Sequence, residues 1–126
     1  MDLKDAFHQM PMYPDSRRYS GTGSPIGMLR CRVLPMGWKN GVAFCQRNIE
    51  TALCPMEDTT SGYIDDLLIG TVRQIEHDTE AMLRQHNVNI GRTLDALSAA
   101  RLVASGPKCQ FLSRRWNGVA MFCEME

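Results

Sequence analysis

Several patterns are missing from this 126-residue sequence, and each absence narrows its function. Fourteen basic residues balance fourteen acidic ones, so the formal net charge is zero and a strongly basic nucleic-acid binder is excluded. No run approaches the ~20 apolar residues of a membrane-spanning helix, and the acidic start at residues 1–5 does not resemble a signal peptide. Five cysteines without a close pair and three scattered histidines show no zinc-ligand spacing. We therefore expect an intracellular protein with reduced thiols.

What is present is the composition of one globular domain, with 44% hydrophobic and 22% charged residues. Apolar periodicity, together with glycine and proline positions, predicts the elements in order. The first elements are a strand or strand-turn at 2–12, turns of a loose hairpin at 15–27 and a half-buried strand at 28–34. A helix follows at 39–53, with an apolar face at Val42, Cys45, Ile49 and Leu53, and then a hairpin around 65–66. The last elements are a long helix at 72–101, which could kink or split at Gly91, and short strands at 102–103 and 110–122. This order predicts an α+β fold with helices on one face of an antiparallel sheet.

The strongest local signal is the sequence Tyr-Ile-Asp-Asp at residues 63–66, which runs into an apolar stretch at 67–69. Aspartate is depleted in strands, and two neighbouring carboxylates repel each other. Such a conflict persists most readily at a functional site, where a hard divalent cation such as Mg²⁺ offsets the repulsion. The structural alternative is a hairpin turn with acidic tips. A third carboxylate for a two-metal site is available at Asp2.

Five segments carry a wider resemblance, in one order along nearly the whole chain. They are residues 2–9 (Asp-Leu-Lys-Asp-Ala-Phe-His-Gln), 32–40 (Arg-Val-Leu-Pro-Met-Gly-Trp-Lys-Asn), 63–66 (Tyr-Ile-Asp-Asp), 108–112 (Lys-Cys-Gln-Phe-Leu) and 116–118 (Trp-Asn-Gly). Together they resemble the palm of reverse transcriptases, particularly those of gypsy-type long-terminal-repeat retrotransposons and their retroviral relatives. The aspartate box alone is moderately specific, whereas five motifs in the correct order are strongly so.

The resemblance implies an RNA-directed DNA polymerase that adds a deoxynucleotide (dNTP) to a primer 3′ end. It implies two Mg²⁺ ions, with Mn²⁺ as a substitute, held by Asp2, the Leu3 carbonyl, Asp65 and Asp66. The remaining implied roles are a steric gate against ribose at Phe7, the floor of the nucleotide pocket at Met36 and Gly37, a proton donor to pyrophosphate at Lys108, and a primer grip at Trp116 and Gly118.

The implied domain is a fragment covering residues 1–126, a polymerase palm with a remnant fingers hairpin. The N-terminal fingers, the thumb and a ribonuclease H domain are absent from this sequence. The implied partners are an RNA or DNA template-primer, the dNTP, and the missing polymerase subdomains or polyprotein segments. We therefore expect the chain to be inactive alone. A polar stretch at residues 59–62 stands where the family has a mostly apolar strand, and Asn117 departs from the primer-grip pattern.

Alternative interpretations remain for individual residues and for the whole chain. Phe7, Met36, Trp38 and Tyr63 could serve only in packing. The chain could be a non-catalytic, retroelement-derived module that binds nucleic acid or a partner protein. It could also be an acidic metal-binding fold unrelated to polymerases.

Overall fold

The computed structural model describes residues 1–71 and 79–111. The predicted start of the long helix and most of the predicted C-terminal strand, including Trp116 and Gly118 of the expected primer grip, lie outside the described residues. None of the helices in the described ranges is long and apolar enough to cross a membrane.

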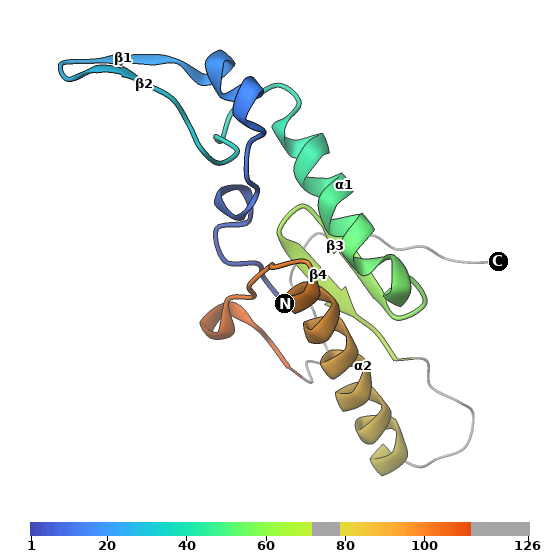
Figure 1. Ribbon diagram of the computed structural model, residues 1–126. Helices are drawn as coiled ribbons and strands as arrows, with labels where there is room; N and C mark the ends of the chain where they lie inside the picture. The colour runs from blue at the N-terminus through green and yellow to red at the C-terminus, as the bar shows by residue number, and fades with distance from the viewer. Residues whose placement is uncertain (72–78, 112–126) are drawn as a thin grey trace.

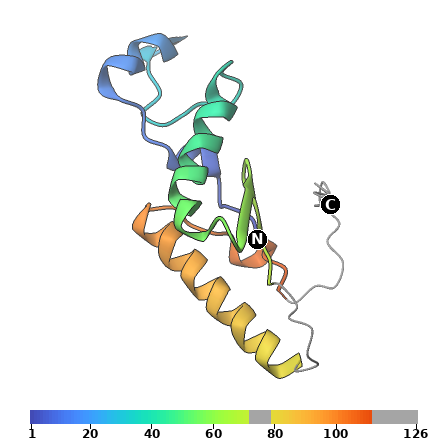
Figure 2. The same ribbon diagram turned by 90° about the vertical axis from the view of Figure 1, so that its right-hand side faces the viewer.

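The centre of the fold is an antiparallel hairpin of two strands, β3 (Thr60–Tyr63) and β4 (Asp66–Ile69). Two helices, α1 (Gly41–Leu53) and α2 (Thr79–Ala99), lie on the same side of this hairpin (Figure 2). The other side leaves Tyr63 53% and Leu68 48% exposed. This arrangement confirms the predicted α+β class with helices on one face of an antiparallel sheet.

Helix α1 packs on the hairpin through the residues that its sequence spacing predicted. Cys45, Ile49 and Leu53 recur every four residues, lie on one face and are buried. The fourth predicted core position, Val42, is 47% exposed and lies outside this line. Pro55 falls in the short 3-10 turn Cys54–Met56 that follows the helix, as expected for a residue that ends helical hydrogen bonding.

Helix α2 is continuous through Gly91, so the predicted alternative of a split at this glycine is wrong. The residues that α2 buries also differ from the apolar residues that were expected to face the core. Asn89 and Thr93 are buried beside Leu97, whereas Leu94 is 41% exposed. The polar members are satisfied by hydrogen bonds, since the hydroxyls of Thr93 and Thr60 lie 2.8 Å apart and the Asn89 amide donates to the Gly70 carbonyl at 3.2 Å.

The first residues of the chain lie between β4 and a segment near residue 103. Asp2 pairs with Asp66 on one side, and Leu3 pairs with Ala104 on the other, both in antiparallel bridges. The strand or strand-turn predicted at 2–12 begins with these two bridging residues, turns into the 3-10 helix Ala6–Gln9 and ends with a further bridge at Pro11. The predicted strand at 102–103 is likewise reduced to bridge-type hydrogen bonding. Leu3, at 1% exposed, joins the core from this position.

A second hairpin, β1 (Thr22–Ser24) with β2 (Gly27–Leu29), extends away from the two helices (Figure 1). It follows the 3-10 helix Pro14–Ser20. The predicted strand at 28–34 is wrong in extent, because pairing stops at Leu29 and resumes only as the single bridge between Pro11 and Val33. All residues of β2 are exposed, so no packed face sustains a longer strand here.

Candidate active site

Two of the predicted carboxylates are brought together by the backbone of the central sheet. The Leu3 amide donates to the Asp65 carbonyl and the Leu67 amide donates to the Met1 carbonyl, each at 2.7 Å, on either side of the Asp2–Asp66 bridge. Directly opposed residues of an antiparallel pair project their side chains to the same face of a sheet. Asp2 and Asp66 therefore share a face although they are far apart in the sequence.

Asp65 lies in the two-residue turn that joins β3 to β4, beside a backbone conformation that is costly for its neighbour. Ile64 has φ 56°, in the left-handed region, which a β-branched residue rarely adopts. The Gln46 side chain of α1 holds this turn from both sides, because its Oε1 accepts from the Ile64 amide at 2.6 Å and its Nε2 donates to the Gly62 carbonyl at 2.9 Å. These bonds offset the cost of the turn and fix the backbone from which Asp65 projects.

Gln46 was not among the residues predicted from the sequence. A glutamine on a helix is ordinarily a surface residue, and only its place beside the buried Cys45 and one turn before Ile49 indicated a position near the core. Its contact depends on how α1 crosses the hairpin. Gly62 allows that close approach, since a Cβ there would meet Ile49 Cγ2 at 3.1 Å and Leu53 Cδ1 at 3.3 Å.

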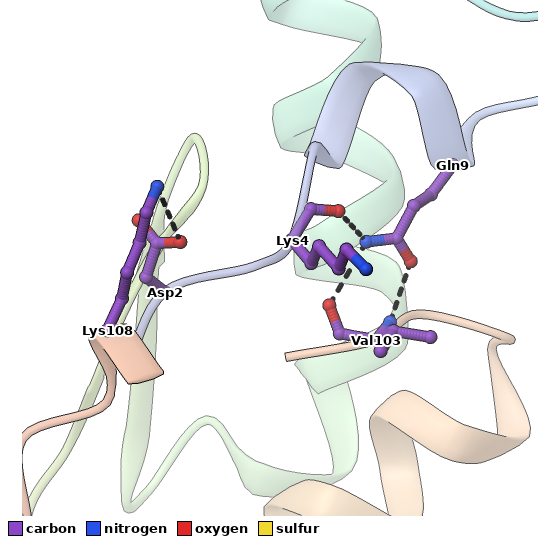
Figure 3. Close-up of polar contacts among 5 residues, drawn as sticks. All are labelled: Asp2, Lys4, Gln9, Val103 and Lys108. Carbon is purple, nitrogen blue, oxygen red and sulfur yellow. Dashed lines mark hydrogen bonds and ion pairs between the residues drawn. The ribbon is translucent and has the colours of Figure 1, made fainter. Parts of the chain in front are cut away.

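Asp2 is the most enclosed of the three carboxylates. Its side chain is 18% exposed, and its Oδ1 is buried without a hydrogen-bond partner in the described part of the chain. The Nζ of Lys108 lies 3.5 Å from that oxygen (Figure 3), so two residues predicted to have separate catalytic roles lie side by side. An incompletely bonded, hard carboxylate oxygen is a ligand that Mg²⁺ accepts, so the residue present at this position fits the predicted cation.

The strand that carries Asp2 is held further along by the Gln9 side chain. Its Oε1 accepts from the Val103 amide at 2.7 Å, and its Nε2 donates to the Val103 carbonyl at 3.0 Å and to the Lys4 carbonyl (Figure 3). The Lys4 amide also donates to the Val103 carbonyl at 2.9 Å. Gln9 therefore continues the pairing between the first residues of the chain and the segment near 103, where the backbone has already turned into a 3-10 helix.

The three aspartates do not form a complete metal-binding group in this structure. Asp65 and Asp66 are exposed, and no set of three His, Cys, Asp or Glu side chains within residues 1–71 and 79–111 is close enough to hold a metal ion. The Leu3 side chain is a core residue without a ligand atom, so the predicted ligand is its main-chain carbonyl. The assignment of Asp2, Leu3, Asp65 and Asp66 as metal ligands stays a prediction.

The predicted nucleotide-binding residues lie in two different environments. Phe7 is partly buried and packs against the hydrophobic core, which agrees with its alternative reading as a packing residue. Met36 is 64% exposed, before the start of α1. Gly37 has φ 84°, a conformation that explains a glycine at this position. Their role in a nucleotide pocket stays a prediction.

The packing of α1 on the β3–β4 turn also changes the pKa of the Cys45 thiol. Burial raises the pKa of the Cys45 thiol above its ordinary value of 9.0, and the nearby negative charge of Asp65 raises it further. Cys45 is therefore an uncharged core residue, held next to the acidic turn by the same contact that positions Gln46.

Comparison with known proteins identifies the family of this chain. The family described as reverse transcriptase (RNA-dependent DNA polymerase) matches residues 1–121. The chain belongs to the reverse transcriptase family.

Similar proteins include segments of viral polyproteins. An enzymatic polyprotein of Cassava vein mosaic virus is 25% identical over 114 residues, which cover 90% of this chain and 16% of that polyprotein. The Gag-Pro-Pol polyprotein of Sheep pulmonary adenomatosis virus is 29% identical over 99 residues, covering 68% of this chain and 6% of the polyprotein. The chain thus spans only a small part of these relatives.

A solved structure has the same fold. The protease-reverse transcriptase of prototype foamy virus superposes with a TM-score of 0.64 over 81% of this chain and 12% of its own, at 20% sequence identity. This likeness extends the α+β description to a reverse transcriptase fold.

Proposed function

We propose that this chain is the palm portion of an RNA-directed DNA polymerase of retroelement origin, which transfers deoxynucleotides to a primer 3′ end. The observation that carries the proposal is the bridge between Asp2 and Asp66. It joins the first predicted catalytic segment to the aspartate box, so carboxylates distant in the sequence share one face of the sheet. Two-metal nucleotidyl transfer requires such carboxylates from separate segments.

Each predicted site residue would have its own role in the reaction. Asp2, the Leu3 carbonyl, Asp65 and Asp66 would hold the cations. Bound Mg²⁺ or Mn²⁺ would lower the pKa of the primer hydroxyl and stabilise the charge of the leaving pyrophosphate. Phe7, Met36 and Gly37 would contact the incoming nucleotide, Lys108 would give a proton to the pyrophosphate, and Trp116 and Gly118 would hold the primer.

We further propose that this chain does not extend a primer by itself. The chain spans 16% or less of the Cassava vein mosaic virus and Sheep pulmonary adenomatosis virus polyproteins described above. Polymerase subdomains or polyprotein segments beyond this sequence would be needed to clamp the template-primer and the triphosphate.

Mn²⁺ binding and primer extension by the full chain test these proposals together. We expect the Asp65→Asn variant to bind Mn²⁺ more weakly than the wild type, and the Asp58→Asn variant, altered at an exposed aspartate before β3, to bind it equally well. Equal Mn²⁺ binding by all three proteins would contradict the metal site. On a homopolymer template we expect no incorporation, and incorporation that Asp65→Asn abolishes would show that the chain is active alone.

A non-catalytic module that binds nucleic acid is the second candidate. The observation that favours it is the Lys108 side chain, which is 69% exposed and offers an ammonium that a phosphate of the backbone would contact. This function predicts salt-sensitive binding of a template-primer that is unchanged by Asp65→Asn. A gel-shift titration that detects no binding at low salt would exclude it.

A further inference from the structure

The roles predicted for Asp2 as a metal ligand and for Lys108 as a proton donor do not explain why the two side chains form an ion pair. Asp2 Oδ1 is buried and accepts no hydrogen bond in the described part of the chain, although burial of a carboxylate is costly without a partner. The Lys108 ammonium, 3.5 Å away, is the cation paired with it in residues 1–71 and 79–111. The lysine therefore stands where a positive charge is needed.

The backbone places this lysine beside Asp2 by a short series of hydrogen bonds. The Ser105 amide donates to the Asp2 carbonyl at 2.7 Å. The 3-10 turn Gly106–Lys108 follows at once, and the Lys108 amide donates to the Ser105 carbonyl at 3.0 Å. Because Ser105 is bonded to the Asp2 strand itself, the Cα of Lys108 is held close to the carboxylate.

The side chain of Lys108 is, in contrast, open to solvent. It is 69% exposed, and an ion pair at 3.5 Å in which the lysine is solvated contributes little to the stability of the fold. Lysine carries its charge on a flexible four-carbon stem, so the ammonium can leave without disturbing the turn. A fixed attachment point and a mobile charge are the properties of an exchangeable counter-ion.

We propose that Lys108 is the resident counter-ion of Asp2, and that its ammonium leaves the carboxylate when a divalent cation binds there. This inference rests on the proposed function, because it takes Asp2 as a metal ligand. Lys108 and the cation compete for one carboxylate. Lys108 thus lowers the affinity of the site for the cation and keeps Asp2 neutralised until the cation arrives.

Direct measurement of Mn²⁺ binding to the full chain by electron paramagnetic resonance tests this competition without any turnover. We expect Lys108→Gln to bind Mn²⁺ more tightly than the wild type by about three- to tenfold, the effect of removing one charge close to a divalent ion in a partly aqueous site. Lys108→Arg keeps the charge and should remain near the wild-type affinity. Thermal unfolding of each variant verifies that the fold is retained.

Lys4→Gln is the matched control for a general charge effect. Lys4 is exposed on the same segment and lies apart from the Asp2–Lys108 pair (Figure 3). Its variant should change Mn²⁺ affinity by less than about twofold, because charges that are separated and solvated interact weakly. An equal gain in Lys4→Gln, or no gain in Lys108→Gln, would overturn the proposal.

Asp2→Asn separates this inference from the proposed function. If Asp2→Asn loses Mn²⁺ while Lys108→Gln gains nothing, the counter-ion role is wrong and the metal site stands. If Asp2→Asn binds Mn²⁺ as the wild type does, Asp2 is not a ligand, and both the metal site and the competition are wrong. A loss in Asp2→Asn with a gain in Lys108→Gln supports both.

Discussion

Gln46 links a helix to a strained turn through one side chain, and its two backbone partners lie on either side of Tyr63. The Ile64 amide, at a φ of 56°, depends on it for a hydrogen bond. This makes Gln46 a positioning residue for Asp65, since it touches the turn and not a reacting group.

Replacement of Gln46 by alanine should lower the free energy of unfolding by about 1–3 kcal/mol, because the partly buried Ile64 amide loses its acceptor. Urea denaturation measures the loss, and hydrogen exchange should show faster exchange of the Ile64 amide. Arg47→Ala, at an exposed position of the same helix, is the control and should change stability by less than about 0.5 kcal/mol. Unchanged exchange at Ile64 would contradict the role given to Gln46.

Cys45 should make the protein less stable in alkali. The pKa of its thiol is raised in the folded state, so above the ordinary value of 9.0 the unfolded chain loses this proton while the folded chain keeps it. The free energy of unfolding should therefore fall with rising pH in that range, by up to about 1.4 kcal/mol per pH unit from this group.

Denaturation of the wild type and Cys45→Ala below and above that pH measures this contribution as the difference in slope. We expect a shallower decline for Cys45→Ala. Cys54→Ala, at an exposed cysteine, should keep the wild-type slope. Parallel slopes for all three proteins would show that Cys45 ionises normally.

At the scale of single residues, the sequence selected candidate residues but did not predict their contacts. Asp65 and Asp66 could be selected because an acid pair conflicts with a strand, and the conflict is visible in the sequence itself. Asp2 became a candidate as a possible third carboxylate and through its likeness to a family motif, whereas its contact with Asp66 gave no signal, since that partner is remote in sequence. Gln46 gave no such signal, because its role depends on the angle at which α1 crosses the hairpin.

Among the elements, the packing of α1 on β3 depends on the absence of a side chain at Gly62. A Cβ there would lie 3.1 Å from Ile49 Cγ2, 3.2 Å from Leu67 Cδ2 and 3.3 Å from Leu53 Cδ1. These three side chains belong to the core, where neighbours leave little room to adjust.

Gly62→Ala should therefore lower the free energy of unfolding by about 1–3 kcal/mol, as overpacking separates the helix from the hairpin. Gly23→Ala is the matched control, because Gly23 is also in a strand and a Cβ there would meet nothing within 4 Å. It should be neutral or slightly stabilising. Equal unfolding midpoints for the two variants in urea would contradict the close contact described at Gly62.

Helices were easier to predict than strands in this chain. The four-residue spacing of Cys45, Ile49 and Leu53 identified α1 and its buried face. In α2 the buried face could not be predicted fully, because it includes Asn89 and Thr93. Polar residues give no hydrophobic signal in a sequence even when they are hydrogen-bonded in the core. In the strand predicted at 28–34, Leu29 is 50% exposed and the pairing of β2 ends there, so that only a bridge at Val33 remains of the rest.

For the whole molecule, the core includes a residue from the third position of the chain. Leu3 is 1% exposed, and its segment is hydrogen-bonded to β4 through the Leu67 amide and to the later segment through the Ser105 amide. Leu3 thus contributes to the joint between segments that are distant in sequence.

Leu3→Ala should cost about 2–5 kcal/mol of unfolding free energy, the usual range for a cavity at a buried leucine. The amides of Leu67 and Ser105 should both exchange faster in this variant, because one segment holds both bonds. Leu68→Ala, at a position 48% exposed on β4, should cost less than about 1 kcal/mol. Loss of protection at only one of the two amides would show that the segment does not act as a unit.

The central position of the first segment also determines when the candidate site can form. Its bond partners lie far along the chain, at a sequence separation of 66 for Met1 and Leu67 and of 94 for Gln9 and Val103. Contacts of such separation form late and slow the folding of a domain. During synthesis, which proceeds from the N-terminus, Asp2 emerges before either neighbour exists. The hairpin and α1 are able to form first, whereas the pairing of Asp2 with Asp66 and Lys108 is completed only after nearly the whole described chain has been made.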